Sequence, residues 1–282
     1  ASNSNTDYFY FNASDQIDIG NTTSPYTTAV FRDVSAWYHC VVIFDSANGT
    51  ASDRLILYIN NVKQTLSATI SLNSTGGNQS GVTYEIGHQG GESRYLDGYL
   101  AEYVFIDGQA LTPDNFAEAD EDSGIWKPID VSGLTFGDNG YYLDFEDSSA
   151  LGNDVSGNNN DFTVNNLTAI DQTTDTPTNN FATWNPLVKT SSTVTISEGN
   201  TIGTEATNGS YFGIVTTMFP TSGKWYGEMK FTSLGTVQTG FITEGTFIDG
   251  DRNLYSSSSS LYWQSGTTSI STILNSSGVT TV

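Results

Sequence analysis

A short acidic segment near the C-terminal end of the sequence carries the spacing of oxygen ligands that calcium uses. Asp249, Asp251 and Asn253 alternate along the chain, which is how a calcium-binding loop begins. The segment then departs from an EF-hand, because Leu254 stands where the tight turn needs glycine and Ser260 stands where a bidentate acid belongs. We therefore exclude an EF-hand and predict an irregular calcium site on the first three side chains.

A second oxygen-rich segment lies near the middle of the chain. Four side chains that end in a carboxylate or an amide occur close together there: Asn153, Asp154, Asn158 and Asp161. Such oxygens are hard ligands of the kind that Ca²⁺ takes in loops. Ca²⁺ is therefore the one cofactor predicted for this chain. The alternative interpretation is that these are solvated loop residues, whose acidity serves solubility.

Flat aromatic side chains in polar stretches are the candidates for ligand binding. A sugar ring can stack its apolar face on an aromatic ring, while a few fixed polar groups bond its hydroxyls. The alternative is that these aromatics pack in a core or an interface. Five of them stand in or near loop-like stretches and are the predicted glycan contacts: Tyr26, Tyr95, Trp126, Tyr255 and Trp263.

The residues that could act as a nucleophile or a base form no recognisable constellation. His39 and Cys40 are neighbours in an apolar run, where a strand histidine and a buried small hydrophobe are expected. His88 stands in a glycine-rich stretch, and no Gly-x-Ser-x-Gly motif accompanies it. The sequence also carries no glycine-rich loop followed by Lys-Ser or Lys-Thr that would bind a phosphate.

Paired carboxylates are the remaining route to catalysis, because a glycoside hydrolase needs two acids about 5–10 Å apart. Glu102 and Asp107 are five residues apart, which places them on opposite faces of a regular strand. Asp144 and Glu146 share a face, but they stand at the start of an asparagine-rich stretch. We therefore predict that the chain is not an enzyme, with a hydrolase as a minor alternative.

Composition argues against two classes of partner. The 282 residues include 31 acidic and 9 basic side chains, which gives a formal net charge of −22. A nucleic-acid binder needs clustered Lys and Arg to displace counterions, and here the bases are scattered. The same scarcity disfavours an anionic membrane surface, and no apolar run approaches the roughly 20 residues that span a bilayer. Neither nucleic-acid binding nor membrane insertion is predicted.

The elements that must position these side chains are short β-strands. Helical periodicity is nearly absent, and β-rich runs recur between clusters of Gly, Asn, Asp and Ser, as in a sandwich or barrel. One helical turn is expected after Leu111, where Thr112 can cap and Pro113 suits the first position. The predicted strands are residues 8–11, 28–31, 37–44, 55–59, 82–86, 99–106, 141–145, 162–164, 211–217, 224–231, 237–242 and 261–264.

Three segments follow from these patterns. Residues 1–130 are predicted to form a first β unit, residues 131–190 a connector rich in Asn, Asp and Thr with short strands, and residues 191–282 a second β unit. The chain has 15 Tyr, 15 Phe and 5 Trp, far more than a disordered polar tract carries, so a core is expected. Its single cysteine rules out an intrachain disulfide.

Several runs in the first unit follow one another in a familiar order. Residues 36–42 read Ala-Trp-Tyr-His-Cys-Val-Val, residues 54–62 read Arg-Leu-Ile-Leu-Tyr-Ile-Asn-Asn-Val, and residues 95–106 and 110–113 follow them. Together they resemble the laminin-G-like, concanavalin-type jelly roll. Asn61 replaces the glycine usual in that family's hairpin, and because Asn also tolerates positive φ, the turn is expected to persist. The strands that usually open this domain are missing, so we interpret the chain as part of a longer protein.

Two later runs carry weaker resemblances. Residues 144–159, together with 176–187, resemble linkers that follow such a domain in large phage proteins. Residues 222–229, Ser-Gly-Lys-Trp-Tyr-Gly-Glu-Met, resemble a core strand of SPRY-type β-sandwiches, and that second unit is expected to be incomplete.

These resemblances imply an all-β protein, an antiparallel jelly-roll sandwich followed by a second sandwich-like unit. They imply a structural and adhesive role on a virion surface, of the phage-fibre type, with lectin-like domains that attach to host-surface glycans. The implied partners are further copies of the chain, with a trimer by analogy, and other virion proteins. The family sometimes binds Ca²⁺ at its sandwich rim, which adds Asp97 to the candidate ligands.

Two rival functions stay open. The first is a purely architectural protein, such as a capsid decoration or a self-assembling extracellular filament, whose sheet edges are completed by a neighbouring chain. The second is an accessory module of a carbohydrate-active enzyme, which would bind glycans without any association with a virion.

Overall fold

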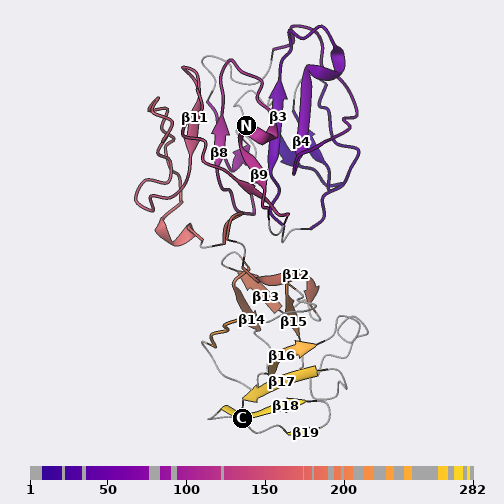
Figure 1. Cartoon of the computed structure of the whole chain (residues 1–282), viewed down its shortest axis with the longest axis vertical. Coiled ribbons are helices and arrows are strands. Elements are labelled where there is room, and N and C mark those ends of the chain that lie inside the picture. The colour runs from indigo at the N-terminus through magenta and orange to yellow at the C-terminus, as the bar shows by residue number, and fades with distance from the viewer. Residues whose placement is uncertain are drawn as a thin grey trace. The chain divides into compact units, whose positions relative to one another are not determined.

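The computed structural model shows an all-β molecule, and none of the residues it describes lies in an α-helix (Figure 1). The described residues are 8–20, 23–33, 36–75, 83–89, 94–121, 124–173, 175–179, 181–189, 194–197, 200–205, 213–218, 227–231, 238–242, 260–265, 270–275 and 278–279. The strands form small sheets of two to four strands, and every pairing between them is antiparallel. Within these residues no helix is long and apolar enough to cross a membrane.

The chain divides into two compact units, Ala1–Phe181 and Ala182–Val282. The first unit extends well into the segment that the sequence assigned to a connector. The reason is that β11 (Tyr141–Leu143) pairs with β8 (Tyr103–Phe105), so this part of the chain has a partner strand of its own.

The described residues of the first unit form five sheets. Its strands are β1 (Phe9–Phe11), β2 (Ile17–Ile19), β3 (Cys40–Phe44), β4 (Leu55–Ile59), β5 (Val62–Lys63), β6 (His88–Gln89), β7 (Arg94–Tyr95), β8 (Tyr103–Phe105), β9 (Ala117–Ala119), β10 (Trp126–Pro128) and β11 (Tyr141–Leu143). The sheets are β1–β2, β3–β4–β5, β6–β7, β8–β11 and β9–β10.

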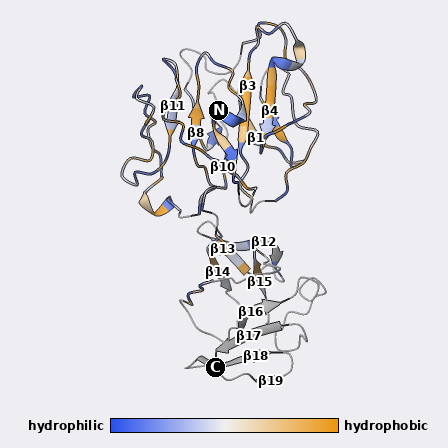
Figure 2. Cartoon of the chain, in the orientation of Figure 1, coloured by the Kyte–Doolittle hydropathy of each residue, from blue (hydrophilic) through white to orange (hydrophobic). Residues whose placement is uncertain are grey.

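The core of this unit forms around β4. Leu55, Leu57 and Ile59 alternate with less buried residues, so one face of the strand is turned inward. They pack in one cluster with side chains from β2 and a following loop, whose buried members are Ile17, Ile19, Leu55, Leu57, Ile59 and Ile70. Figure 2 shows the hydrophobic colouring of β3 and β4. Removing this apolar surface from water is the main favourable contribution to folding here.

The hairpin between β4 and β5 confirms the turn expected from the sequence. Ile59 pairs with Val62, which leaves Asn60 and Asn61 as a two-residue loop. Their φ angles are 47° and 65°, both in the left-handed region that a type I′ turn requires and that Asn tolerates. The Asn60 side chain also accepts a hydrogen bond from the His39 backbone N–H at 2.8 Å, which ties the turn to β3.

Several predicted strands are shorter than expected, and the described parts of four form no strand: residues 28–31, residues 83–86 of the predicted 82–86, residues 162–164, and residues 227–231 of the predicted 224–231. The strand over residues 99–106 is reduced to β8, because Glu102 adopts a φ of 52° that no strand permits. Residues 28–31 form no strand, and Thr27 Oγ1 instead donates to the Ala29 carbonyl at 2.8 Å, a local bond that competes with pairing. Residues 162–164 likewise stay outside any strand.

The expected helical turn is present as a single turn of 3₁₀-helix, Pro113–Asn115. Asn115 Oδ1 accepts the Thr112 backbone N–H at 3.1 Å, so the first N–H of the turn has a partner. Further 3₁₀ turns span Ala51–Asp53 and Ala169–Asp171.

The second unit is described only in parts. β12 (Trp184–Lys189) pairs with β15 (Ile214–Thr216), and β13 (Val194–Ser197) pairs with β14 (Ile202–Glu205). β16 (Gln238–Ile242), β17 (Ser260–Ser265), β18 (Ile270–Asn275) and β19 (Gly278–Val279) form a four-stranded sheet in chain order. The strands predicted at residues 237–242 and 261–264 correspond to β16 and β17.

Candidate functional site

The β6–β7 hairpin presents one predicted glycan contact in a defined arrangement. Its register sets His88 opposite Tyr95 and Gln89 opposite Arg94. Because successive side chains of a strand point to opposite faces, His88 and Tyr95 share one face of the hairpin, and Gln89 and Arg94 share the other.

Tyr95 is stacked on His88 and open to solvent. The ring centroids are 4.6 Å apart with an interplanar angle of 24°, and Tyr95 is 75% exposed, the highest value for an exposed aromatic among the described residues. Glu85 Oε2 lies 2.9 Å from His88 Nδ1 and fixes the imidazole in turn. We call Tyr95, His88 and Glu85 the Tyr95 platform.

The platform is suited to binding a flat apolar surface. One face of the Tyr95 ring rests on the imidazole, so its large exposed area belongs to the other face and the edge. A ring held in this way loses little conformational entropy when a ligand stacks on it, which favours affinity.

The other predicted glycan contacts are placed differently. Tyr26 is 42% exposed and lies on another segment, where its backbone N–H donates to Ser67 Oγ at 3.1 Å. Trp126, in β10, is half-buried. Trp263 belongs to β17, of which only the backbone is described, and Tyr255 lies outside the described residues.

Trp126 has an internal hydrogen-bond partner. Its Nε1–H donates to His39 Nδ1 at 2.8 Å, which requires that this ring nitrogen carry no proton. Burial lowers the pKa of His39, in agreement with a neutral imidazole. The indole therefore links β10 to His39, which directly precedes β3. This agrees with the core or strand-edge role expected of His39.

The structure places the central predicted calcium ligand, Asp154, inside a hydrogen-bond network. The residue is 6% exposed, and its carboxylate accepts four hydrogen bonds, from the backbone N–H groups of Tyr142, Ser156 and Asn160 and from Ser156 Oγ, at 2.8–2.9 Å. Burial opposes ionisation, but these donors outweigh it and lower the pKa of Asp154. Here the carboxylate holds protein groups in place.

Two asparagines extend this network to a neighbouring turn. Asn158 Nδ2 donates to the carbonyls of Gly137 and Gly140 at 2.6 and 2.9 Å, and Asn160 Nδ2 donates to those of Asp138 and Gly140 at 3.2 and 2.9 Å. Asp161 Oδ1 accepts the Asp154 backbone N–H at 2.9 Å. We call residues 152–162 the Asp154 loop, which these bonds fasten to the turn before β11.

The other predicted calcium ligands that the structure describes are exposed side chains on separate segments. Asn153 is exposed beside the buried Asp154, and Asp97 is exposed between β7 and β8. Asp249, Asp251 and Asn253 lie outside the described residues. Within the described part of the chain, no group of three or more His, Cys, Asp or Glu side chains is arranged to hold a metal ion. Calcium binding stays a prediction.

The structure assembles a carboxylate cluster that the sequence pattern did not reveal. Glu102 and Asp144 each adjoin the last pair of the β8–β11 ladder, Tyr103 with Leu143, and Tyr142 Oη donates a hydrogen bond to Glu102 Oε2. Partial burial raises the pKa of Glu102, and the Asp144 and Glu146 carboxylates add to this effect against the Tyr142 bond. The spacing of Glu102 and Asp107 along the sequence gives no sign of this neighbour, which only the pairing of β8 with β11 brings close.

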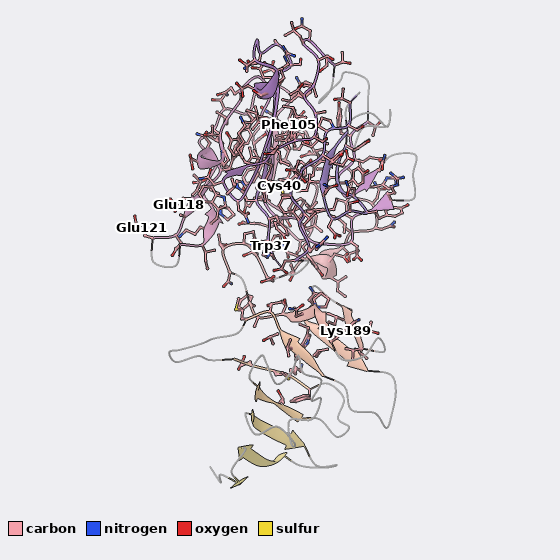
Figure 3. The ribbon with its side chains drawn as sticks, turned by 90° about the vertical axis from the view of Figure 1, so that its right-hand side faces the viewer. Trp37, Cys40, Phe105, Glu118, Glu121 and Lys189 are labelled. Carbon is pink, nitrogen blue, oxygen red and sulfur yellow. The ribbon has the colours of Figure 1, made fainter. Side chains whose placement is uncertain are left out.

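The lone thiol is placed where it is inert. Cys40 lies among the crowded side chains of the first unit, whereas Glu118 and Glu121 lie at its margin (Figure 3). Burial raises the pKa of the Cys40 thiol to about 12, so the thiolate is scarcely populated at neutral pH. This supports the expectation of a small hydrophobe: Cys40 begins β3, beside β4 in the same sheet, and packs against the core cluster.

No protein-family model matches this chain, and no significant match to it was found among curated proteins or solved structures.

Proposed function

We propose that this chain is a structural and adhesive protein of a virion surface, of the phage-fibre type, which attaches to host-surface glycans. The observation that supports glycan binding is the Tyr95 platform, an exposed aromatic ring held rigid by a stacked imidazole. The all-β architecture with short antiparallel sheets is compatible with a laminin-G-like jelly roll in the first unit, and we include that fold in the proposal.

The test is binding of the full chain to a glycan array and to intact bacteria, with and without EDTA. Wild type is compared with Tyr95→Ala, which removes the ring, and Tyr95→Phe, which keeps it. Saturable binding that Tyr95→Ala abolishes and Tyr95→Phe retains supports the proposal. Glycan binding that is unchanged in Tyr95→Ala would show that the binding site lies elsewhere in the chain. Loss of glycan binding in EDTA would show that a calcium site contributes to it.

A purely architectural subunit is the second candidate, and one observation favours it. The segment after β7 exposes Leu96, Tyr99 and Leu100, by 46%, 43% and 41%, and exposed apolar surface of this kind is typical of a protein–protein contact. Homo-oligomerisation, with a trimer by analogy, would cover it. A chain that forms a defined oligomer by light scattering and binds no glycan or cell would favour this function. Glycan binding without any virion association would instead favour an accessory module of a carbohydrate-active enzyme.

A further inference from the structure

Resting on the proposed function, we propose that the Tyr95 platform selects electrically neutral sugars and discriminates against anionic glycans such as uronic-acid polymers. The argument depends on where the few positive charges of the first unit are placed.

The base next to Tyr95 in the sequence points away from the platform. Arg94 precedes Tyr95 in β7, so the alternation of the strand sends its side chain to the opposite face of the hairpin. There its Nη1 donates to Gln89 Oε1 at 3.1 Å, and its charge acts on the hydroxyl of Tyr10 in β1. A ligand stacked on Tyr95 therefore has no guanidinium beside it on the same face.

The other bases of the first unit are already engaged. The residues up to Phe181 contain five Lys and Arg side chains, Arg32, Arg54, Lys63, Arg94 and Lys127, all of them described. Arg32, Lys63 and Lys127 form ion pairs with Asp15, Asp53 and Asp120. Arg54 donates to the backbone carbonyls of Asn48, Gly49 and Ile70. Each of these four bases therefore already has a carboxylate or carbonyl partner in the fold, and none of them is part of the Tyr95 platform.

The charge on the platform side has the wrong sign for an anion. The platform itself includes the carboxylate of Glu85, and the whole chain carries a net charge of −22. Both repel an anionic ligand, and the repulsion grows as salt is lowered. A neutral pyranose is not repelled in this way. It offers an apolar ring face to Tyr95 and hydroxyls that need no counter-charge.

The experiment titrates the full chain by calorimetry with three probes at low and moderate salt. These are a neutral glucan oligosaccharide, a uronate oligosaccharide and a glucosamine oligosaccharide. The variants are Tyr95→Ala and Arg94→Gln, the second being the matched control on the opposite face, and circular dichroism verifies that each is folded. We expect the neutral probe to bind, with affinity about tenfold weaker in Tyr95→Ala and unchanged in Arg94→Gln.

The outcomes separate this inference from the function on which it rests. Uronate binding that matches or exceeds neutral binding, and that Arg94→Gln weakens, overturns the inference while leaving adhesion to glycans intact. Preference for the glucosamine probe also overturns it, since that result assigns the site to a cation held by the Tyr95 face and Glu85. No binding of any probe contradicts the proposed function itself.

Discussion

The Asp154 loop and the Tyr95 platform both hold one side chain in a fixed position, but they face opposite environments. Asp154 is 6% exposed, and its carboxylate accepts four hydrogen bonds from the surrounding chain. Tyr95 is 75% exposed, and its support, His88 with Glu85, lies behind the ring. Polar groups that satisfy one another inside stabilise a fold, whereas rigid apolar surface turned outward is available to a ligand.

The largest effect in this comparison is expected from Asp154→Ala. The change leaves three backbone N–H groups without their acceptor and releases the loop from β11, so the free energy of unfolding should fall by about 3 kcal/mol. Chemical denaturation at neutral pH measures it. Glycan binding at the platform should survive wherever the variant is folded.

Asp147 provides the matched control. It repeats the local motif, since its Oδ1 accepts the Ser149 backbone N–H at 2.8 Å, but it is exposed. Asp147→Ala should therefore cost much less stability than Asp154→Ala. The pKa of Asp154 is lowered in the fold, so its contribution is complete above the unfolded value of about 3.9 and disappears as the pH falls towards the folded value. Equal losses in the two variants would contradict a special role for the Asp154 loop.

The same comparison shows what sequence patterns can predict. The continuous apolar run of residues 55–59 predicted β4 over its full length, because a short β-rich run between polar clusters is typical of a strand. The turn at Asn61 was expected to persist in the resembled hairpin because Asn, like Gly, adopts positive φ, and Asn60 and Asn61 both do so. Local chemistry was sufficient in both places.

Features that depend on distant residues were not predictable in this way. The interior position of Asp154 depends on a hydrogen bond from the distant Tyr142 N–H. From the sequence alone, an acid within an asparagine-rich stretch is equally well interpreted as a solvent-exposed loop residue. Glu102 acquires Asp144 as a neighbour only through the β8–β11 register. The exposure of Tyr95 was a prediction, but its support by His88 appears only once β6 and β7 pair. These contacts depend on the register in which the strands pair, and that register cannot be read from a single sequence.

The second prediction tests whether the platform serves binding without serving the fold. Tyr95→Ala removes an outward-facing ring, so the free energy of unfolding should change by no more than about 0.5 kcal/mol, whereas glycan affinity falls about tenfold. Denaturation and calorimetry on the same preparation measure both. A large loss of stability would place Tyr95 in a structural role and remove the contrast with Asp154.

The third prediction concerns an intermediate case, the half-buried His39–Trp126 pair. Burial lowers the pKa of His39, so the unfolded chain binds a proton at a higher pH than the folded chain does. Stability should therefore be complete above about pH 6.5 and decline as the pH falls from there towards the folded pKa. Protonation also removes the acceptor for Trp126 Nε1.

Urea denaturation between about pH 7.5 and pH 5.5 checks this expectation. His39→Asn is the control, because its amide oxygen can accept the same bond and does not titrate, while His88 contributes equally to both proteins. The pH slope should be smaller in His39→Asn. Equal slopes would show that the His39–Trp126 bond does not couple to the proton.

The smallest effect is expected at the Asn60–Asn61 turn, which is exposed like the platform but depends on backbone conformation. Asn61→Gly keeps a residue that adopts φ near 65° at no steric cost and loses only the 3.2 Å bond to Asp114, so stability should change by less than about 0.5 kcal/mol. Asn61→Ala places a Cβ in the left-handed region and should cost about 1 kcal/mol. Thermal denaturation of both variants measures the difference. If Asn61→Gly and Asn61→Ala lower the stability equally, the hydrogen bond of the Asn61 side chain, and not its φ, stabilises the hairpin. The turn would then resemble the Asp154 loop, which side-chain hydrogen bonds hold in place.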